Sequence, residues 1–201
     1  MPTRSRPPTI AGPRVYLRPP RLDDAGAYLA AVRASRSLHG PWTKPPQTRA
    51  RFEAFVARFG PEGQVATHAG FLVFRKEDDA LVGVFNFSEI VRGGFQSAYL
   101  GYMGFLPHAG QGYMTEGMAL ALEVAFRKLR LHRVEVNIQP TNARSLALAR
   151  RVGFTREGFS RRYVKIAGRW RDHERYAMLA EDWAKLRSRF VGRLARRSAP
   201  R

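Results

Sequence analysis

The sequence contains no cysteine, which excludes disulfide bonds and thiolate-ligated metal ions. It has no apolar run of about 18 residues, the length expected of a membrane-spanning helix. The opening stretch MPTRSRPPTIAGPR lacks the apolar core of a signal peptide. The five histidines are dispersed without a short ligand spacing such as HExxH, and no G-x-S-x-G motif occurs. We therefore expect a cytoplasmic protein with no catalytic metal.

Acidic residues are also scarce, because 16 Asp and Glu stand against 35 Lys and Arg, giving a net charge of +19. Such a charge attracts polyanions, including nucleic acid and phosphate-rich cofactors. The segment AKLRSRFVGRLARRSAPR, residues 184–201, carries seven basic residues and no acidic one. We interpret it as a basic, partly helical C-terminal tail. It either contacts the ribosome or RNA or is a solvated chain end.

The rest of the chain has the composition of one globular domain, with 44% apolar and 25% charged residues. Residues 1–12, rich in proline and arginine, are expected to be disordered, and 13–183 to form the domain. Alternating apolar patterns predict strands at 14–19, 70–76, 80–90, 95–105, 133–138, 159–166 and 169–179. Helical spacing predicts helices at 23–35, 51–59, 112–130 and 142–152. This order indicates an α+β fold.

The pattern of the helix at 112–130 is the clearest. Six apolar residues share one arc of the helical wheel: Met114, Met118, Ala121, Leu122, Ala125 and Leu129. Four charged residues lie opposite: Glu116, Glu123, Arg127 and Arg130. The arrangement predicts a surface helix packed on a sheet. For the next helix, Asn142 is a candidate N-cap and Gly153 a left-handed stop.

Two glycines, Gly110 and Gly112, stand between the strand ending near Phe105 and the helix at 112–130. Free N–H groups and the helix dipole at such a helix start favour a bound phosphate, which glycine allows to approach closely. The dinucleotide fingerprint G-x-G-x-x-G is not met because Thr115 replaces its third glycine. A Walker loop is not met because Met118-Ala119 replaces Lys-Ser/Thr. The glycines alone leave a phosphate site and an ordinary tight turn equally open.

A wider pattern surrounds the glycines. It comprises the strand YLGYMGF, the segment GQGYMTEGM, the strand VEVNI, the N-x-x-S-x-x-L motif from Asn142 to Leu148, and RVGF at 151–154. Residues 99–154 thus resemble the GCN5-related N-acetyltransferase (GNAT) family. The stretches NFSEIVRGGFQSAYLGY (86–102) and AGRWRDHERYAM (167–178) are similar to the ribosomal-protein-alanine acetyltransferases of the RimJ and RimL type.

The resemblance implies a central, mostly antiparallel twisted sheet of about six or seven strands, flanked by helices and splayed at a cleft for acetyl-CoA. It implies that five backbone amides bind the pyrophosphate, those of Gly110, Gln111, Gly112, Tyr113 and Met114. The backbone of Phe105 and Leu106 would pair with the pantetheine arm, and Asn142 would hydrogen-bond it.

Where the family often has Gln or Arg, three residues before the first glycine, this chain has Pro107. The pyrophosphate either loses that side-chain contact or His108 replaces it.

Acetyl transfer to an amine requires a neutral nucleophile and a proton for the departing thiolate. A protein α-amine has a pKa of about 7.7–8.0, against about 10.4 for lysine, so it needs no strong base near neutral pH. Ser145 matches the family position implicated in protonating the thiolate, and its alternative role is helix packing. Glu89 is our candidate base, with a solvated edge carboxylate as the alternative reading.

Three further side chains are candidates for the acceptor cleft: His173, Trp42 and Trp170. Each could equally be structural.

We therefore expect an acetyl-CoA-dependent N-acetyltransferase acting on a protein N-terminus, at alanine or serine of a ribosomal protein. Two alternatives stay open: a small-molecule amine such as an aminoglycoside or polyamine as acceptor, and a non-catalytic ribosome- or RNA-binding protein with the same fold. The sequence does not determine the oligomeric state.

Overall fold

The computed structural model describes residues 9–40, 42–60 and 67–196. The strands are β1 (Ile10–Ala11), β2 (Val15–Arg18), β3 (Ala69–Arg75), β4 (Leu81–Val91), β5 (Ser97–Gly104), β6 (Arg133–Ile138), β7 (Thr155–Ile166) and β8 (Arg169–Leu179). The helices are α1 (Ala25–Ala34), α2 (Arg36–His39), α3 (Arg49–Phe59), α4 (Tyr113–Glu123), α5 (Ala143–Val152) and α6 (Ala180–Arg196). A 3-10 turn at Leu22–Asp24 precedes α1, and a π-helical turn at Val124–Lys128 extends α4.

The strands form one sheet in the order β1-β2-β3-β4-β5-β6-β8-β7, and every neighbouring pair is antiparallel except β5 and β6. The predicted α+β class with a mostly antiparallel sheet is confirmed. Over the described residues the sheet has eight strands rather than six or seven. The additional strand, β1, pairs with β2 and lies within the segment expected to be disordered, of which residues 1–8 are outside the described residues.

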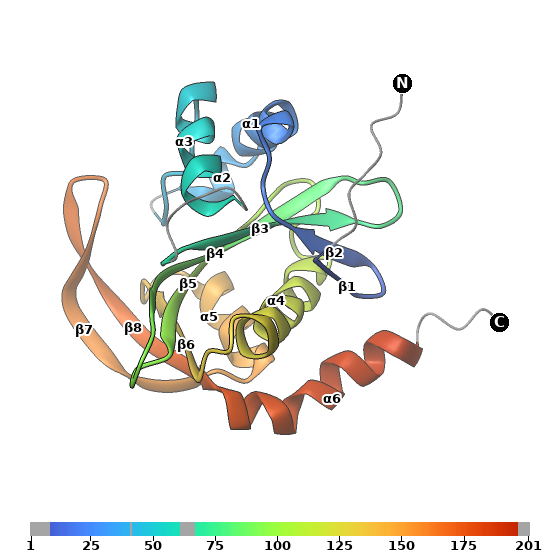
Figure 1. Ribbon diagram of the computed structural model, residues 1–201. Helices are drawn as coiled ribbons and strands as arrows, with labels where there is room; N and C mark the ends of the chain where they lie inside the picture. Colours follow the sequence, from blue (N-terminus) through green and yellow to red (C-terminus); the bar gives the residue numbers. More distant parts are fainter. Residues whose placement is uncertain (1–8, 41, 61–66, 197–201) are drawn as a thin grey trace.

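Helices cover both faces of the sheet (Figure 1). On β3, Leu72 and Phe74 pack with α1 and α3, whereas Phe71 and Val73 belong to the larger core built around α4 and α5. A strand buried on both faces reads as a continuous apolar run, which explains the sequence GFLVF.

The prediction that the helix at 112–130 lies on the surface is wrong, because α4 is buried on nearly all sides. Glu116 and Glu123, placed on its outer face by the helical wheel, are only 7% and 6% exposed. Partners far away in the sequence cover them: the backbone of Arg14 and Val15 donates to Glu116, and Trp183 and Arg187 of α6 donate to Glu123. Charged groups are buried when they are paired and hydrogen-bonded, so the part of the polar arc at Glu116 and Glu123 is a second contact face, whereas Arg127 and Arg130 in the following turn are exposed.

The predicted ends of α5 are confirmed. The Asn142 side chain accepts a hydrogen bond from the Ser145 N–H at 3.2 Å, as an N-cap does. Gly153 ends the helix with φ of +101°, in the left-handed region that favours glycine. This cap fixes the position of Ser145 in the first turn of α5.

Helix α6 begins at Ala180, before the expected tail boundary at 184. Trp183 is buried, and Leu186 and Phe190 pack against the larger core. Residues 184–190 are therefore docked on the domain, while the expected tail's last residues, 197–201, lie outside the described residues.

Strands β5 and β6 diverge. They pair only from Ser97↔Arg133 to Tyr99↔Glu135, although β5 continues to Gly104 and β6 to Ile138. The two strands therefore separate beyond Tyr99 and Glu135, and this opening is called the splay. From the end of β5 the chain continues to the Gly110–Gly112 turn.

Candidate functional site

A cleft of about 1940 Å³ opens at the splay of β5 and β6. Its lining comes from β5, Leu106, the turn at 108–112, the first turns of α4, the segment from Thr141 into α5, and Ser37, Leu38, His39, Trp42 and Thr43; Pro13, Arg14, Arg189 and Phe190 also contribute. The cleft brings together these residues singled out from sequence: Leu106, His108, Gly110, Gln111, Gly112, Tyr113, Met114, Asn142, Ser145 and Trp42.

The turn has the geometry of an anion site. Gly110 and Gly112 have φ values of +82° and +83°, a region where only glycine is unstrained. Gly112 is the N-cap of α4 and has no capping side chain, so the N–H groups of Tyr113 and Met114 have no partner within the helix. These amides and the helix dipole favour a phosphate at this point.

A side chain not anticipated from sequence lies beside this turn. The Arg14 guanidinium donates to the Gln111 carbonyl at 3.2 Å and lies over the Tyr113 ring, 4.8 Å from its centroid. Arg14 also pairs with Glu116 at 3.1 Å. It therefore brings to the turn a cation that the sequence lacks at Pro107.

The backbone edge of β5 that faces the splay belongs to Tyr102 and Gly104, and the Gly104 carbonyl accepts a hydrogen bond from His39. Phe105 N–H donates to Val82 of β4, so the preceding residue, Gly104, points its backbone groups toward the splay. Leu106 N–H donates to the Ser35 hydroxyl, and the Phe105 carbonyl accepts from His108. The expected backbone pairing of an extended ligand with Phe105 and Leu106 therefore has no free N–H, and the geometry favours Tyr102 and Gly104.

Two hydroxyl groups meet where the splay opens. Tyr102 from β5 and Ser145 from α5 lie 2.6 Å apart, hydroxyl to hydroxyl. Burial raises the pKa of Tyr102 to about 12, although the Ser145 hydrogen bond opposes this shift. Tyr102 is therefore neutral at physiological pH and can donate its proton to Ser145 Oγ, which leaves the serine proton available to a group in the cleft.

Asn142 has a donor to spare. Its Oδ1 is occupied by the cap, and none of the described residues accepts a hydrogen bond from its Nδ2. As Asn142 lines the cleft, its amide can donate to a ligand carbonyl.

Four of the residues suggested from sequence lie outside the lining of the cleft: Phe105, which is fully buried, Glu89, Trp170 and His173. Glu89 is exposed on β4, four residues beyond Phe85, the partner of Tyr102, or roughly 13 Å along the strand. Trp170 is 59% exposed near the tip of the β7–β8 hairpin. His173 of β8 is buried, which lowers its pKa, and it contacts the Arg171 carbonyl and the Tyr163 ring.

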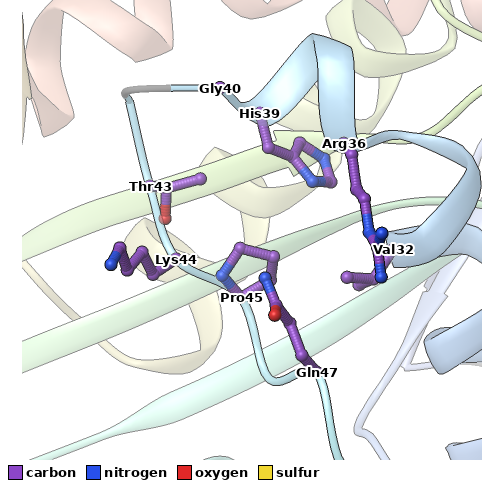
Figure 2. Close-up of a pocket in the computed structure, with 8 residues that line it drawn as sticks. All are labelled: Val32, Arg36, His39, Gly40, Thr43, Lys44, Pro45 and Gln47. Carbon is purple, nitrogen blue, oxygen red and sulfur yellow. The ribbon is translucent and has the colours of Figure 1, made fainter. Parts of the chain in front are cut away.

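His39 lines both the cleft and a smaller cavity of about 170 Å³, and Figure 2 shows the residues around the smaller cavity. His39 Nε2 is 3.0 Å from the Gly104 carbonyl, and because a carbonyl can only accept, this nitrogen is the donor. Nδ1 is buried and has no hydrogen-bond partner among the residues that the structure describes. Arg36 and Lys44 line the same small cavity. The hydrogen bond from His39 Nε2 ties helix α2 to β5 and occupies the Gly104 carbonyl.

Sequence reasoning did not identify Arg14, Tyr102 or His39 as site residues. Arg14 and Tyr102 were recognised only as members of strands, and no local motif distinguishes them. They reach the cleft because β2 lies beside the start of α4 and the register of β5 points Tyr102 toward α5.

Known proteins were compared with this chain. A family model described as an acetyltransferase (GNAT) domain matches residues 14–155. A probable N-acetyltransferase of Bacillus subtilis, YjcK, is 32% identical over 181 residues, covering 86% of this chain and 98% of the relative. The [ribosomal protein uS5]-alanine N-acetyltransferase of Escherichia coli is 39% identical over 113 residues, 56% of this chain and 58% of that enzyme.

Among solved structures, Mycobacterium smegmatis RimJ in complex with CoA-disulfide superposes with a TM-score of 0.80 at 27% identity. The match covers 90% of each chain.

Proposed function

Since the chain belongs to the GNAT family of N-acetyltransferases, we propose that it transfers an acetyl group from acetyl-CoA to the α-amine of a protein N-terminus. We further propose that the acceptor is an N-terminal alanine or serine of a ribosomal protein. The neutral amine attacks the thioester carbon directly: the C–N bond forms, the C–S bond breaks to release the CoA thiolate, and the nitrogen loses one proton to water.

The observation that carries the α-amine assignment is the lack of a free carboxylate in the cleft. Of the described residues that line it, only Glu116 is acidic. Both carboxylate oxygens of Glu116 accept hydrogen bonds within the protein, from the Arg14 side chain and from the backbone N–H groups of Arg14 and Val15. An α-amine, with a pKa of about 7.7–8.0, supplies a useful neutral fraction unaided, whereas a lysine does not.

The residues of the cleft can be assigned roles in this reaction. The turn amides and Arg14 would hold the pyrophosphate, and the open edge of β5 together with the Asn142 amide would align the pantetheine arm. Ser145 would give its proton to the departing sulfur and regain one from Tyr102, 2.6 Å behind it.

The ribosomal acceptor is supported by the relatives. The Escherichia coli relative is named as an alanine N-acetyltransferase of ribosomal protein uS5, and the RimJ structure superposes over 90% of this chain. The test is to incubate ribosomal proteins, free and in intact particles, with this enzyme and acetyl-CoA, and to measure their intact masses. We expect one protein to gain a single acetyl group at its N-terminal alanine or serine. No mass change in any ribosomal protein would contradict the ribosomal acceptor.

A polyamine acceptor is the second candidate. Spermidine N-acetyltransferase of Vibrio cholerae has the same fold, with a TM-score of 0.71 at 20% identity. At this identity the likeness shows the fold alone. The cleft argues against a polycation, because Arg14, Arg144, Arg151 and Arg189 line it alongside one carboxylate, that of Glu116. A spermidine assay under the same conditions separates the two candidates.

A non-catalytic RNA-binding role is disfavoured, since the hydroxyl pair of Tyr102 and Ser145 lies inside the cleft rather than on a basic outer surface. Release of free thiol from acetyl-CoA in the presence of an acceptor peptide distinguishes an enzyme from a binding protein.

A further inference from the structure

One end of the cleft is lined by arginines without carboxylate partners. Arg144 and Arg151 of α5 and Arg189 of α6 line the cleft, and none of them forms an ion pair with a described residue. Their guanidinium charges are therefore available to an anionic ligand in the cleft.

These arginines lie beside the phosphate-binding turn. Arg151 Nη1 is 3.5 Å from the Thr115 hydroxyl, and Thr115 is three residues after Gly112, roughly 5 Å along the helix. Around them the lining is apolar, formed by Ala119 of α4, Leu148 of α5 and Phe190 of α6. This end thus combines an apolar groove with cations.

Specific contacts hold α6 in place at this end. Trp183 Nε1 and Arg187 Nε donate to Glu123 of α4 at 2.9 and 2.8 Å. Leu186 packs where Gly153 has no Cβ, since a Cβ there would lie 2.7 Å from Leu186 Cδ1. The Phe190 ring stacks on Trp183 at 5.8 Å. The position of Arg189 beside the cleft is therefore set by the core.

We propose that α6 completes the acetyl-CoA site by binding its 3′-phosphoadenosine end. Arg189 and Arg151 pair with the 3′-phosphate, and Phe190 with Leu148 contacts the adenine. The inference rests on the proposed function and deepens it. The turn amides serve the pyrophosphate, whereas the 3′-phosphate is a second dianion that needs its own cations, and guanidinium groups bind phosphate in a bidentate manner. Helix α6 lies beyond residues 14–155 matched by the family model.

Calorimetric titration of the full chain with acetyl-CoA and with 3′-dephospho-acetyl-CoA tests this assignment. For the wild type we expect at least about tenfold tighter binding of acetyl-CoA, the effect of one lost charged hydrogen bond. Arg189→Gln should lose most of this preference while binding the dephospho compound as before. Phe190→Ala should weaken the binding of both compounds by the same factor, because both carry adenine. Arg169→Gln removes an exposed arginine far from the cleft and should change neither affinity.

The outcomes separate the two claims. Equal affinities of the wild type for both compounds, or equal losses for both in Arg189→Gln, would overturn the α6 assignment while leaving acetyl-CoA binding intact. Binding of neither compound would overturn the proposed function together with this inference. Displacement of acetyl-CoA by a short RNA, combined with indifference to the 3′-phosphate, would assign the arginines to RNA and also overturn the proposal.

Discussion

The hydroxyl pair of Tyr102 and Ser145 makes a quantitative prediction. Ser145→Ala removes the proton donor to the thiolate and should lower kcat by about 100-fold, the lower range for general acid catalysis. Tyr102→Phe removes only the hydrogen bond at 2.6 Å that polarises the serine, so kcat should fall by roughly tenfold, or about 1.4 kcal/mol. Because Tyr102 acts through Ser145, the double variant should be no slower than Ser145→Ala alone.

The assay is steady-state thiol release with a saturating acceptor peptide. Both single variants should keep the KM for acetyl-CoA within about twofold if the pair acts mainly in the transition state. The pKa of Tyr102 is about 12, so this hydroxyl does not titrate between pH values of about 6 and 9. The pH–rate profile of Tyr102→Phe should therefore have the same shape as that of the wild type in this range. Tyr16→Phe is the matched control, since its hydroxyl bonds Asp79 away from the cleft. Multiplicative losses in the double variant, or full activity in Tyr102→Phe, would refute the relay.

Three further predictions concern the turn and the α6 contacts. Gly112→Asp should abolish the rise in Tm produced by acetyl-CoA, because its carboxylate repels the pyrophosphate; an unchanged rise would place the phosphate elsewhere. Gly153→Ala should lower stability by about 2 kcal/mol in urea unfolding, from a φ of +101° and the contact with Leu186, and wild-type stability would contradict the packing. Glu123→Gln should lower the free energy of unfolding by about 2 kcal/mol at pH near 7, and by less at pH below about 4. Burial opposes ionisation of Glu123, but bonds from Arg187 and Trp183 outweigh it, so the pKa is lowered and the stabilisation disappears as acid protonates the carboxylate. A deficit independent of pH would show that charge is not its cause.

The sequence predicted the site best where function constrains local backbone geometry. Gly110 and Gly112 need positive φ, Asn142 caps α5 and Gly153 ends it, and each is readable from a few neighbouring residues. The order of strands and helices followed from apolar periodicity in the same way. Such features depend on short-range sterics and hydrogen bonding, which a single sequence records.

Long-range contacts were not predictable. The helical wheel assigned Glu116 and Glu123 to solvent, because a charge on the outer face of a helix is usually solvated. Their partners, Arg14 and Arg187, lie 102 and 64 residues away in the sequence, and no pattern in the neighbouring residues predicts these contacts. Glu89 was proposed as a base from its place on a strand beside the motif, but register places it beyond the end of the cleft.

Helix α6 shows the same limit. Its basic residues predicted a tail, whereas its apolar face, with Leu186 and Phe190 four residues apart, docks on the core. Both signals are present in the sequence. Only the structure shows that docking turns Arg189 toward the cleft rather than leaving it on a free chain end.

The choice between amines is the central claim of the proposed function, and one peptide tests it directly. A short peptide with a free N-terminal alanine and one internal lysine presents both amines to the enzyme at equal concentration. After partial turnover with acetyl-CoA near neutral pH, tandem mass spectrometry locates the acetyl group. We predict acetylation at the alanine α-amine alone, because the cleft offers no free carboxylate to deprotonate lysine. Acetyl groups found mainly on the lysine side chain would contradict the account.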